Sequence, residues 1–221
     1  MINLVLITSI IRTSEKPLSY APRSVFNHMQ RFQQTQLTIK SIKEKIPNCK
    51  ILLVECSELN KEEIRFFSNN CDYVLNLYDN KDICENINSE SKSLGEGTMT
   101  LCAIEFIISQ NIVYDNLIKI SGRYWLSSKF NYDLLNNNDI VIKYIDGNIN
   151  NVCTALYKLP QNKILYIKQM ILSNLDAMRR CIGYEVLFAF FIRNINDCKI
   201  IHLNFIGIEG YISVSGELYS G

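Results

Sequence analysis

The apolar residues of the first 121 positions gather in short continuous runs rather than in an alternating pattern. Four runs stand out: Asn3–Ile11, which is rich in β-branched residues, Lys50–Glu55, Tyr73–Leu77 and Asn116–Ser121. Continuous apolar runs of this length are typical of strands buried on both faces, as in a parallel sheet. We therefore predict four buried parallel strands in this half of the chain.

Helical spacing fills most of the gaps between these runs. From about residue 24 to Pro47, apolar residues recur at helical intervals: Phe32, Ile39, Ile42 and Ile46. Residues 60–63 (Asn-Lys-Glu-Glu) have the form of a capping box, which predicts a short helix with Ile64 and Phe67 on its buried face. A further helix is predicted from Thr98 onward.

The stretch Tyr78–Gly97 has few apolar residues and is dominated by Asp, Asn, Lys, Ser and Gly. We predict a long loop here, and long loops in compact domains are usually functional or mobile. A mobile loop of this kind would order over a bound ligand and exclude water from the site.

The second half of the chain is richer in predicted strands, at Asp139–Ile145, Val152–Leu159 and Lys199–Phe205, with helices at Gln161–Leu172 and Asp176–Arg193. The order of elements predicts a single α/β domain with a Rossmann-like, mostly parallel central sheet and helices on both faces. Residues 1–121 would form a nucleotide-binding half and residues 122–221 an acceptor-side half.

Composition narrows the class of protein. The chain has 221 residues, 48% of them apolar, and a net charge of +1 without a basic stripe, so nucleic acid is not an expected partner. The run Ile2–Ile11 is too short to span a bilayer. Eight cysteines are scattered without a Cys-x-x-Cys pair, which favours reduced thiols in a cytoplasmic protein over a disulfide framework.

Ligands of open parallel sheets bind beyond the carboxyl ends of the strands. At one such end, Glu55 suits a ribose hydroxyl or a base N–H, with a solvated strand-end charge as the equal alternative. Arg12 follows the first strand and suits a phosphate or a base, unless it is only a surface arginine. Beyond the fourth strand, Gly122 allows close approach to the backbone, and Arg123 is a bidentate donor suited to a diphosphate. Pairing of Arg123 with Asp133 is the alternative.

Lys92, Gly95 and Glu96 belong to a polar stretch that leads into a helix, where backbone N–H groups favour phosphate oxygens. Neither the P-loop pattern nor a Gly-x-Gly-x-x-Gly after the first strand is present, which disfavours ATPase, GTPase and dinucleotide chemistry. Glu185 lies in an otherwise apolar helical stretch, where desolvation suits a general base. A carboxylate on the helix surface is the commoner outcome.

Several segments together resemble a known family. They are Arg31 with residues 34–47, Ile51–Ser57, Lys92–Glu96, Lys119–Tyr124 and Gly207–Gly216. This pattern is similar to small GT-A-type glycosyltransferases of large DNA viruses of algae and amoebae and their bacterial relatives. The resemblance implies transfer of a sugar from a UDP- or GDP-type nucleotide sugar to a hydroxyl of a glycan or protein, in the host cytoplasm if the protein is viral.

Carried over by this resemblance, Thr8, Ser9, Arg12 and Glu55 would line the nucleoside pocket, Lys92 and Arg123 would face the diphosphate, and Glu185 would be the acceptor's base. GT-A enzymes commonly hold Mn²⁺ or Mg²⁺ with an Asp-x-Asp after the fourth strand, where this chain has Ser121-Gly122-Arg123. Either Arg123 replaces the charge of the metal, or Asp79 and Asp82 supply its ligands.

Two further functions stay open. One is another nucleotide-handling enzyme, such as a nucleotidyltransferase, and the other is a non-catalytic α/β nucleotide-binding module. The missing Asp-x-Asp is the best argument from the sequence for the non-catalytic module.

Overall fold

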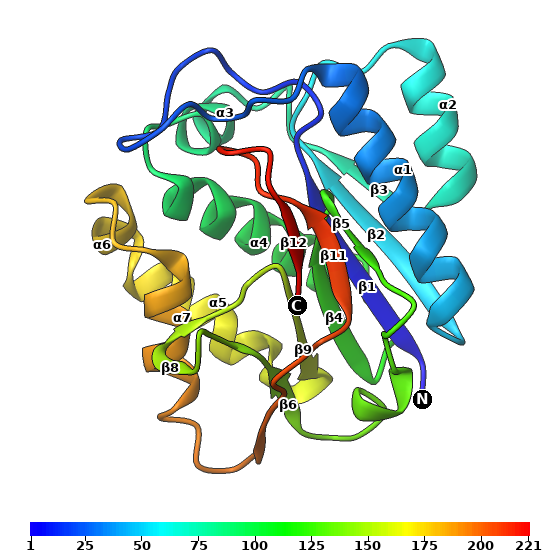
Figure 1. The fold of residues 1–221 in the computed structure, drawn as a ribbon, viewed down its shortest axis with the longest axis vertical. Coiled ribbons are helices and arrows are strands. Elements are labelled where there is room, and N and C mark those ends of the chain that lie inside the picture. Colours follow the sequence, from blue (N-terminus) through cyan, green and yellow to red (C-terminus); the bar gives the residue numbers. More distant parts are fainter.

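The computed structural model describes residues 1–221 and confirms the α/β class (Figure 1). A seven-stranded sheet has the order β10-β6-β9-β4-β1-β2-β3. Its strands are β1 (Asn3–Ser9), β2 (Cys49–Glu55), β3 (Tyr73–Asn76), β4 (Asn116–Ser121), β6 (Ile140–Ile142), β9 (Leu156–Pro160) and β10 (Ile200–His202). β1, β2, β3 and β4 are mutually parallel, and β9 is antiparallel to both β4 and β6. β4 belongs to residues 1–121 and β9 to residues 122–221, so their pairing joins the two predicted halves of the chain in one sheet.

Alternate residues of β1 and β2 point to opposite faces of this sheet, and each face has its own core. Leu4 and Leu6 belong to a cluster with helices α4 (Lys92–Ser109), α5 (Ile164–Ser173) and α7 (Tyr184–Ile192). Val5 and Ile7 belong to a cluster with α1 (His28–Lys45) and α2 (Lys61–Asn70). Because both faces are covered, the strands read as continuous apolar runs instead of an alternation.

Several further elements outside the seven-stranded sheet are short. They are α3 (Lys81–Ile87), α6 (Leu175–Arg179), the 3₁₀ turns η1 (Tyr132–Leu134) and η2 (Gln161–Lys163), and the two-stranded sheet β7 (Tyr144–Ile145) with β8 (Asn148–Val152). No helix combines the length and the apolar character needed to cross a membrane.

A second, antiparallel sheet lies over the α1 side of the molecule and was not predicted. It consists of β5 (Tyr124–Leu126), β11 (Ile208–Tyr211) and β12 (Leu218–Ser220). Leu126 and Ile208 join the same core cluster as α1. These strands are three or four residues long, too short to give a recognisable period. As Figure 1 shows, the C-terminal hairpin thereby returns to the middle of the fold.

The prediction of a long loop at Tyr78–Gly97 is wrong. α3 occupies residues 81–87, and α4 begins at Lys92, six residues before the predicted start at Thr98. Asn80 and Ser91 cap these helices through their side chains, accepting from the N–H groups of Ile83 and Leu94. Asn80 and Ser91 are recognisable capping residues, but the polar residues of α3 and of the first turn of α4 concealed the two helices in the sequence.

Other boundaries shifted as well. The predicted helix 176–193 is divided into α6 and α7, and the predicted strand 199–205 has only the three residues of β10. On α2, Phe67 is fully buried as predicted, whereas Ile64 is half exposed. Phe67 packs edge-on against Phe32 of α1 and Phe66, so Phe66 instead of Ile64 completes the contact.

We predict that Gly210→Ala destabilises the C-terminal hairpin. A Cβ at this position would lie 2.4 Å from the Arg123 carbonyl oxygen and 2.8 Å from Tyr124 Cα, so β11 must move away from β5. Overpacking of this kind costs about 1–3 kcal/mol. Urea unfolding followed by fluorescence measures the change. Gly183→Ala, whose Cβ would meet only ordinary contacts at 3.5 Å or more, is the control, and equal effects of the two substitutions would refute the explanation.

Candidate functional site

A pocket of about 260 Å³ lies beyond the carboxyl ends of β1 and β4, close to the lower limit of ~300 Å³ for ordinary small-molecule sites. The N-terminal loop, the start of α4 and the C-terminal hairpin complete its walls. Its lining includes six of the residues predicted from the sequence: Thr8, Ser9, Lys92, Gly95, Glu96 and Arg123. The structure thus brings together side chains that are far apart in the chain.

Arg31 of α1 is the most unusual group in this lining. Its side chain is buried, and it donates to the Ile10 carbonyl oxygen at 2.6 Å and to the hydroxyls of Ser24 and Ser213 at 3.2 and 3.1 Å. No carboxylate pairs with it. Burial and then the charge of Arg123 lower the pKa of Arg31 to about 9, against a smaller raising effect of Glu55. The guanidinium is therefore still charged at neutral pH, in surroundings that disfavour its charge.

Two more arginines line the same pocket without an ion pair. Arg123 lies near the ring of Tyr124, and its Nε–H is buried without a partner. The alternative pairing of Arg123 with Asp133 does not occur. Arg23 donates only to main-chain oxygens of Lys16, Ile87, Asn88 and Ser89. Three guanidinium groups thus share one cavity, and an uncompensated cluster of this kind is suited to an anion.

Four alternating charges connect α7, α4 and β4 along one wall. Lys92 Nζ is 2.7 Å from Glu185 Oε1, and Lys119 Nζ is 2.7 Å from Glu96 Oε1. Burial alone would lower the pKa of Lys92, but Glu185 and Glu96 raise it above its ordinary value. Burial alone would raise the pKa of Glu96, but Lys119 and Lys92 hold it below its ordinary range. Glu96 therefore remains an ionised carboxylate in the pocket lining.

Glu185 lies beside the pocket instead of in its lining. Its carboxylate is mostly buried, with 21% of the side chain exposed, and its partner Lys92 does line the cavity. The ion pair fixes the Glu185 carboxylate at the edge of the site.

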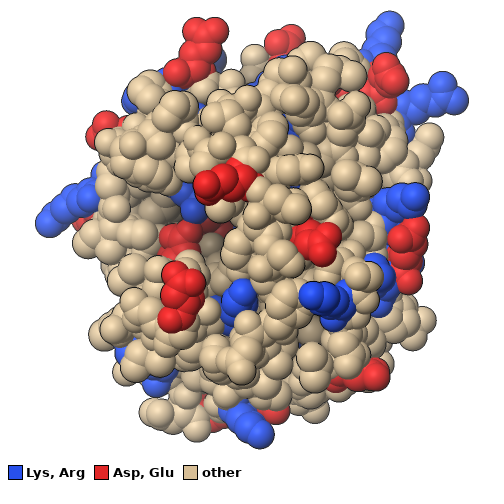
Figure 2. Space-filling model, viewed as in Figure 1, with Lys and Arg blue, Asp and Glu red and all other residues tan.

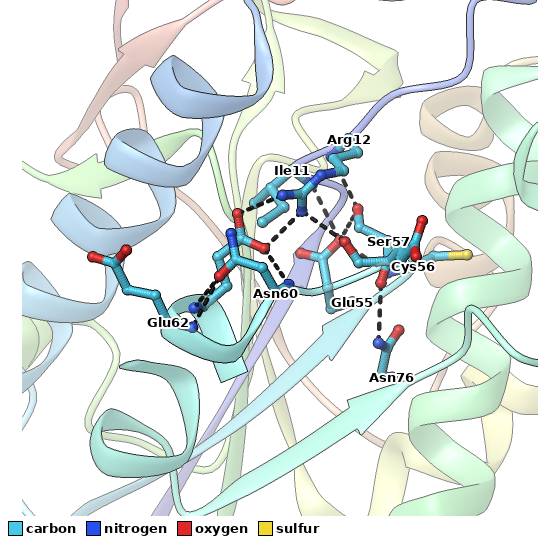
Figure 3. A network of polar contacts seen from close by, with 10 residues as sticks. Ile11, Arg12, Glu55, Cys56, Ser57, Asn60, Glu62 and Asn76 are labelled. Atoms are coloured by element: carbon cyan, nitrogen blue, oxygen red, sulfur yellow. Dashed lines mark hydrogen bonds and ion pairs between the residues drawn. The ribbon is translucent and has the colours of Figure 1, made fainter. Parts of the chain in front are cut away.

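Arg12 is committed to a different contact. Its guanidinium makes a two-point pair with Glu63, at 2.7 and 2.8 Å, and donates to the Glu58 carbonyl oxygen. Glu63 also accepts from the N–H of Asn60 and so closes the capping box of α2. Figure 3 shows this network below the loop that follows β1. Arg12 is absent from the pocket lining, so its side chain ties β1 to α2.

Glu55 is fully buried behind the pocket. Its Oε1 accepts from the N–H groups of Ile11 and Cys56, at 3.1 and 3.0 Å, and from the Ser57 hydroxyl at 2.6 Å. Burial raises the pKa of Glu55 despite these bonds. As Figure 3 shows, this carboxyl joins the chain segments that follow β1 and β2. Glu55 is absent from the pocket lining and supports the backbone at the ends of these two strands.

Two glycines permit close packing around the pocket. A Cβ at Gly95 would lie 2.9 Å from the Ile87 carbonyl oxygen, where α3 meets α4. Gly122 is buried beside Ser9 and Thr35 and donates to the Thr8 carbonyl oxygen. Gly95 lines the cavity, whereas Gly122 sets the backbone that presents Ser121 and Arg123.

The metal ligands considered from the sequence do not fit a cation site in the pocket. Asp79 and Asp82 line a separate groove with Asn76 and Asn80. Nowhere in residues 1–221 do three or more His, Cys, Asp or Glu side chains come together as a group that could hold a metal. Glu96, the carboxylate in the lining, is paired with Lys119. Cationic side chains occupy this wall instead of the oxygen ligands that Mn²⁺ or Mg²⁺ requires.

The sequence did not predict Arg31, Arg23 or Ser213 as parts of the pocket. Ser213 accepts from Arg31 and donates to the Arg23 carbonyl oxygen. A signal was present for Arg31: it precedes a run of polar residues at helical spacing, Thr35 and Thr38, on the buried face of α1. Polar side chains on a buried helix face indicate either hydrogen bonds within the protein or a binding site. No such signal identified Ser213.

The fold has a counterpart among solved structures. A protein from Desulfovibrio desulfuricans G20, provisionally described as a nucleotide-diphospho-sugar transferase, matches with a TM-score of 0.51 over 91% of this chain and 79% of its own, at 10% sequence identity. At this identity the likeness establishes a Rossmann-like, GT-A-like fold and no more. No protein-family model matches the sequence, and a comparison with curated proteins found no match.

We predict opposite pH trends for Glu55→Gln and Glu63→Gln. The folded-state pKa of Glu55 is raised, so its contribution to stability is full below the unfolded-state pKa of ~4.3 and declines as pH rises through the folded-state pKa. The folded-state pKa of Glu63 is net lowered: burial raises it, but the bonds from Arg12 and Asn60 outweigh burial. Its contribution is present above the unfolded-state pKa and is lost as pH falls.

Between about pH 2 and about pH 8, and relative to wild type, Glu55→Gln should therefore gain stability as pH rises above ~4.3, and Glu63→Gln should lose stability as pH rises toward ~4.3. Thermal unfolding across this pH range measures both. Glu55→Ala should destabilise at every pH, by about 1–3 kcal/mol for each N–H left without an acceptor. Parallel pH curves for the two Gln variants would contradict the assignment.

Proposed function

We propose that this protein is a glycosyltransferase that transfers a sugar from a nucleoside diphosphate sugar to an acceptor hydroxyl. The observation that carries the proposal is Arg31, a buried guanidinium in the pocket wall that pairs with no carboxylate. An unpaired buried charge is costly unless an ion of opposite sign completes it. The GT-A-like fold supports a nucleotide as the source of that negative charge.

The arginines suit a diphosphate in particular. Arg31, Arg123 and Arg23 come from α1, the segment after β4 and the N-terminal loop, so they surround a ligand instead of facing it from one side. Planar guanidinium groups bind phosphate oxygens through two parallel bonds. Figure 2 shows basic and acidic side chains intermixed over one face of the molecule, which favours a small anion over an extended polyanion as the ligand.

The nucleoside would lie against the strand ends. Thr8 and Ser9 line the pocket at the end of β1 and offer hydroxyl groups. Tyr20 is largely exposed at the rim, where its ring can stack on a base. Glu55 supports this floor from behind through the Ile11 and Cys56 backbone.

In the proposed transfer, the acceptor oxygen forms a bond to the anomeric carbon as the bond from that carbon to the diphosphate oxygen breaks. Arg123 stabilises the charge that develops on the departing diphosphate. Glu185 takes the proton of the acceptor hydroxyl, positioned for this by its ion pair with Lys92. Arginines carry out the charge neutralisation that a divalent cation performs in other enzymes of this fold.

The first prediction from this proposed function concerns nucleotide binding. The protein should bind UDP or GDP more tightly than the corresponding monophosphate, and Arg31→Met or Arg123→Met should weaken diphosphate binding about ten- to a hundred-fold, because each removes a charge-assisted contact of ~1.5–3 kcal/mol. Calorimetry measures both. Arg65→Met, which removes an exposed arginine of α2, should leave affinity unchanged. Absence of binding to any uridine, guanosine or adenosine diphosphate would overturn the proposal.

Metal dependence is the second prediction. Removal of divalent cations with EDTA should change the affinity for a nucleoside diphosphate by less than about two-fold, because arginines instead of carboxylates surround the anion. The same titration with added Mn²⁺ provides the comparison. A large gain of affinity with Mn²⁺ that Asp79→Asn or Asp82→Asn abolishes would contradict this and place a metal at that groove.

The division of roles gives a third prediction. Glu185→Gln should leave nucleotide binding nearly intact and reduce sugar transfer by on the order of a hundred-fold, the usual scale for general-base catalysis. Donor hydrolysis and transfer are measured together in wild type and variant. Transfer at the wild-type rate would show that the base is elsewhere, with Glu96 as the next carboxylate to replace.

A further inference from the structure

Two cysteines from different elements lie in contact outside the pocket. Cys56 follows β2, Cys84 is on α3, and their sulfurs are 3.5 Å apart. All eight cysteines of the protein are free thiols. The two sulfurs are within hydrogen-bonding distance of each other, and the residues are 28 positions apart in the chain.

The two thiols differ in their surroundings. Cys56 is buried, with 3% of its surface exposed, and burial, followed by the bond to Cys84, raises its pKa. Cys84 is partly exposed and donates to the carbonyl oxygens of Leu77 and Tyr78, at 3.4 and 3.1 Å. An oxidant from solution therefore meets Cys84 first.

This contact is one helical turn from the pocket. Ile87, three residues after Cys84 on α3, lines the cavity. The carbonyl oxygens of Ile87, Asn88 and Ser89 accept from the Arg23 guanidinium. Whatever fixes α3 to β2 thus also fixes the segment that holds a pocket arginine.

We propose that Cys56 and Cys84 form a reversible disulfide, a modification site that takes a small-molecule disulfide as its oxidant. The Cys84 thiolate attacks one sulfur of the oxidant, whose S–S bond breaks and releases one thiolate. The Cys56 thiolate then attacks Cys84 Sγ and displaces the second thiolate. The protein loses two hydrogens, and the oxidant becomes two thiols.

The bond requires only a small approach of the two sulfurs. A disulfide requires sulfurs about 2.05 Å apart, so the present 3.5 Å contact must shorten by roughly 1.5 Å. Cys84 is on the seven-residue helix α3, in which Ile87 is the one buried residue. Cys84 is only partly buried, whereas Cys56 is buried at the end of β2, so we expect Cys84 to make most of this adjustment.

The test is mass mapping of the intact, folded protein after incubation with oxidised glutathione and alkylation of the remaining thiols. We expect a linked peptide pair containing Cys56 and Cys84, a loss of two hydrogens, and a melting temperature several degrees higher that returns to its starting value with dithiothreitol. Hydrogen exchange of α3 should slow in the oxidised form. Cys84→Ser should abolish the link and the stabilisation.

Cys102→Ser is the matched control, because Cys102 of α4 is also partly buried and close enough to influence the pKa of Cys56. It should leave the Cys56–Cys84 link intact. A persistent glutathione adduct on Cys84, linkage of Cys56 to another cysteine, or no oxidation of either thiol would each overturn the proposal. None of these readouts involves nucleotide binding, so the result is independent of the function proposed above.

Discussion

The site depends on a positive charge that the fold buries without an acidic partner. Arg31 is held by one carbonyl oxygen and two serine hydroxyls, which orient the guanidinium but do not neutralise it. Desolvation of such a group opposes folding, and a bound anion reverses that cost. The protein thus carries a local instability at the place where a ligand would relieve it, a compromise common at functional sites.

Other charged side chains near the pocket, unlike Arg31, do have partners of opposite charge. Arg12 pairs with Glu63, Lys92 with Glu185, and Lys119 with Glu96. These pairs fasten the strand ends to α2, α4 and α7 and so build the walls. The arginines that line the cavity are the ones without a carboxylate. The arrangement therefore separates charges that pair with carboxylates from arginine charges that do not.

The sequence predicted the parts of the fold that rest on local periodicity. The buried runs of β1, β2 and β4 and the periodic face of α1 all fell near their predicted positions, because burial on both faces leaves a plain apolar pattern. Arg123 and Glu96 were predicted for the site because Arg123 follows the apolar run of β4 and Glu96 precedes Thr98, the predicted start of a helix. Arg31 and Ser213 could not be predicted for it, because their meeting depends on the return of the C-terminal hairpin over α1. The family resemblance assigned Glu55 and Arg12 to the nucleoside pocket, with a solvated strand-end charge and a surface arginine as the alternatives. In the structure their partners are Ile11, Cys56 and Glu63.

The most direct test of this account is a crystal structure of the protein with a nucleoside diphosphate, grown in the presence of Mn²⁺. We predict diphosphate oxygens within hydrogen-bonding distance of the Arg31 and Arg123 guanidinium groups, the base near Thr8 and Tyr20, and no metal ion between protein and diphosphate. A diphosphate bound outside this pocket, or one held by Mn²⁺ at Asp79 and Asp82 with Arg31 still without an anion, would contradict the central claim.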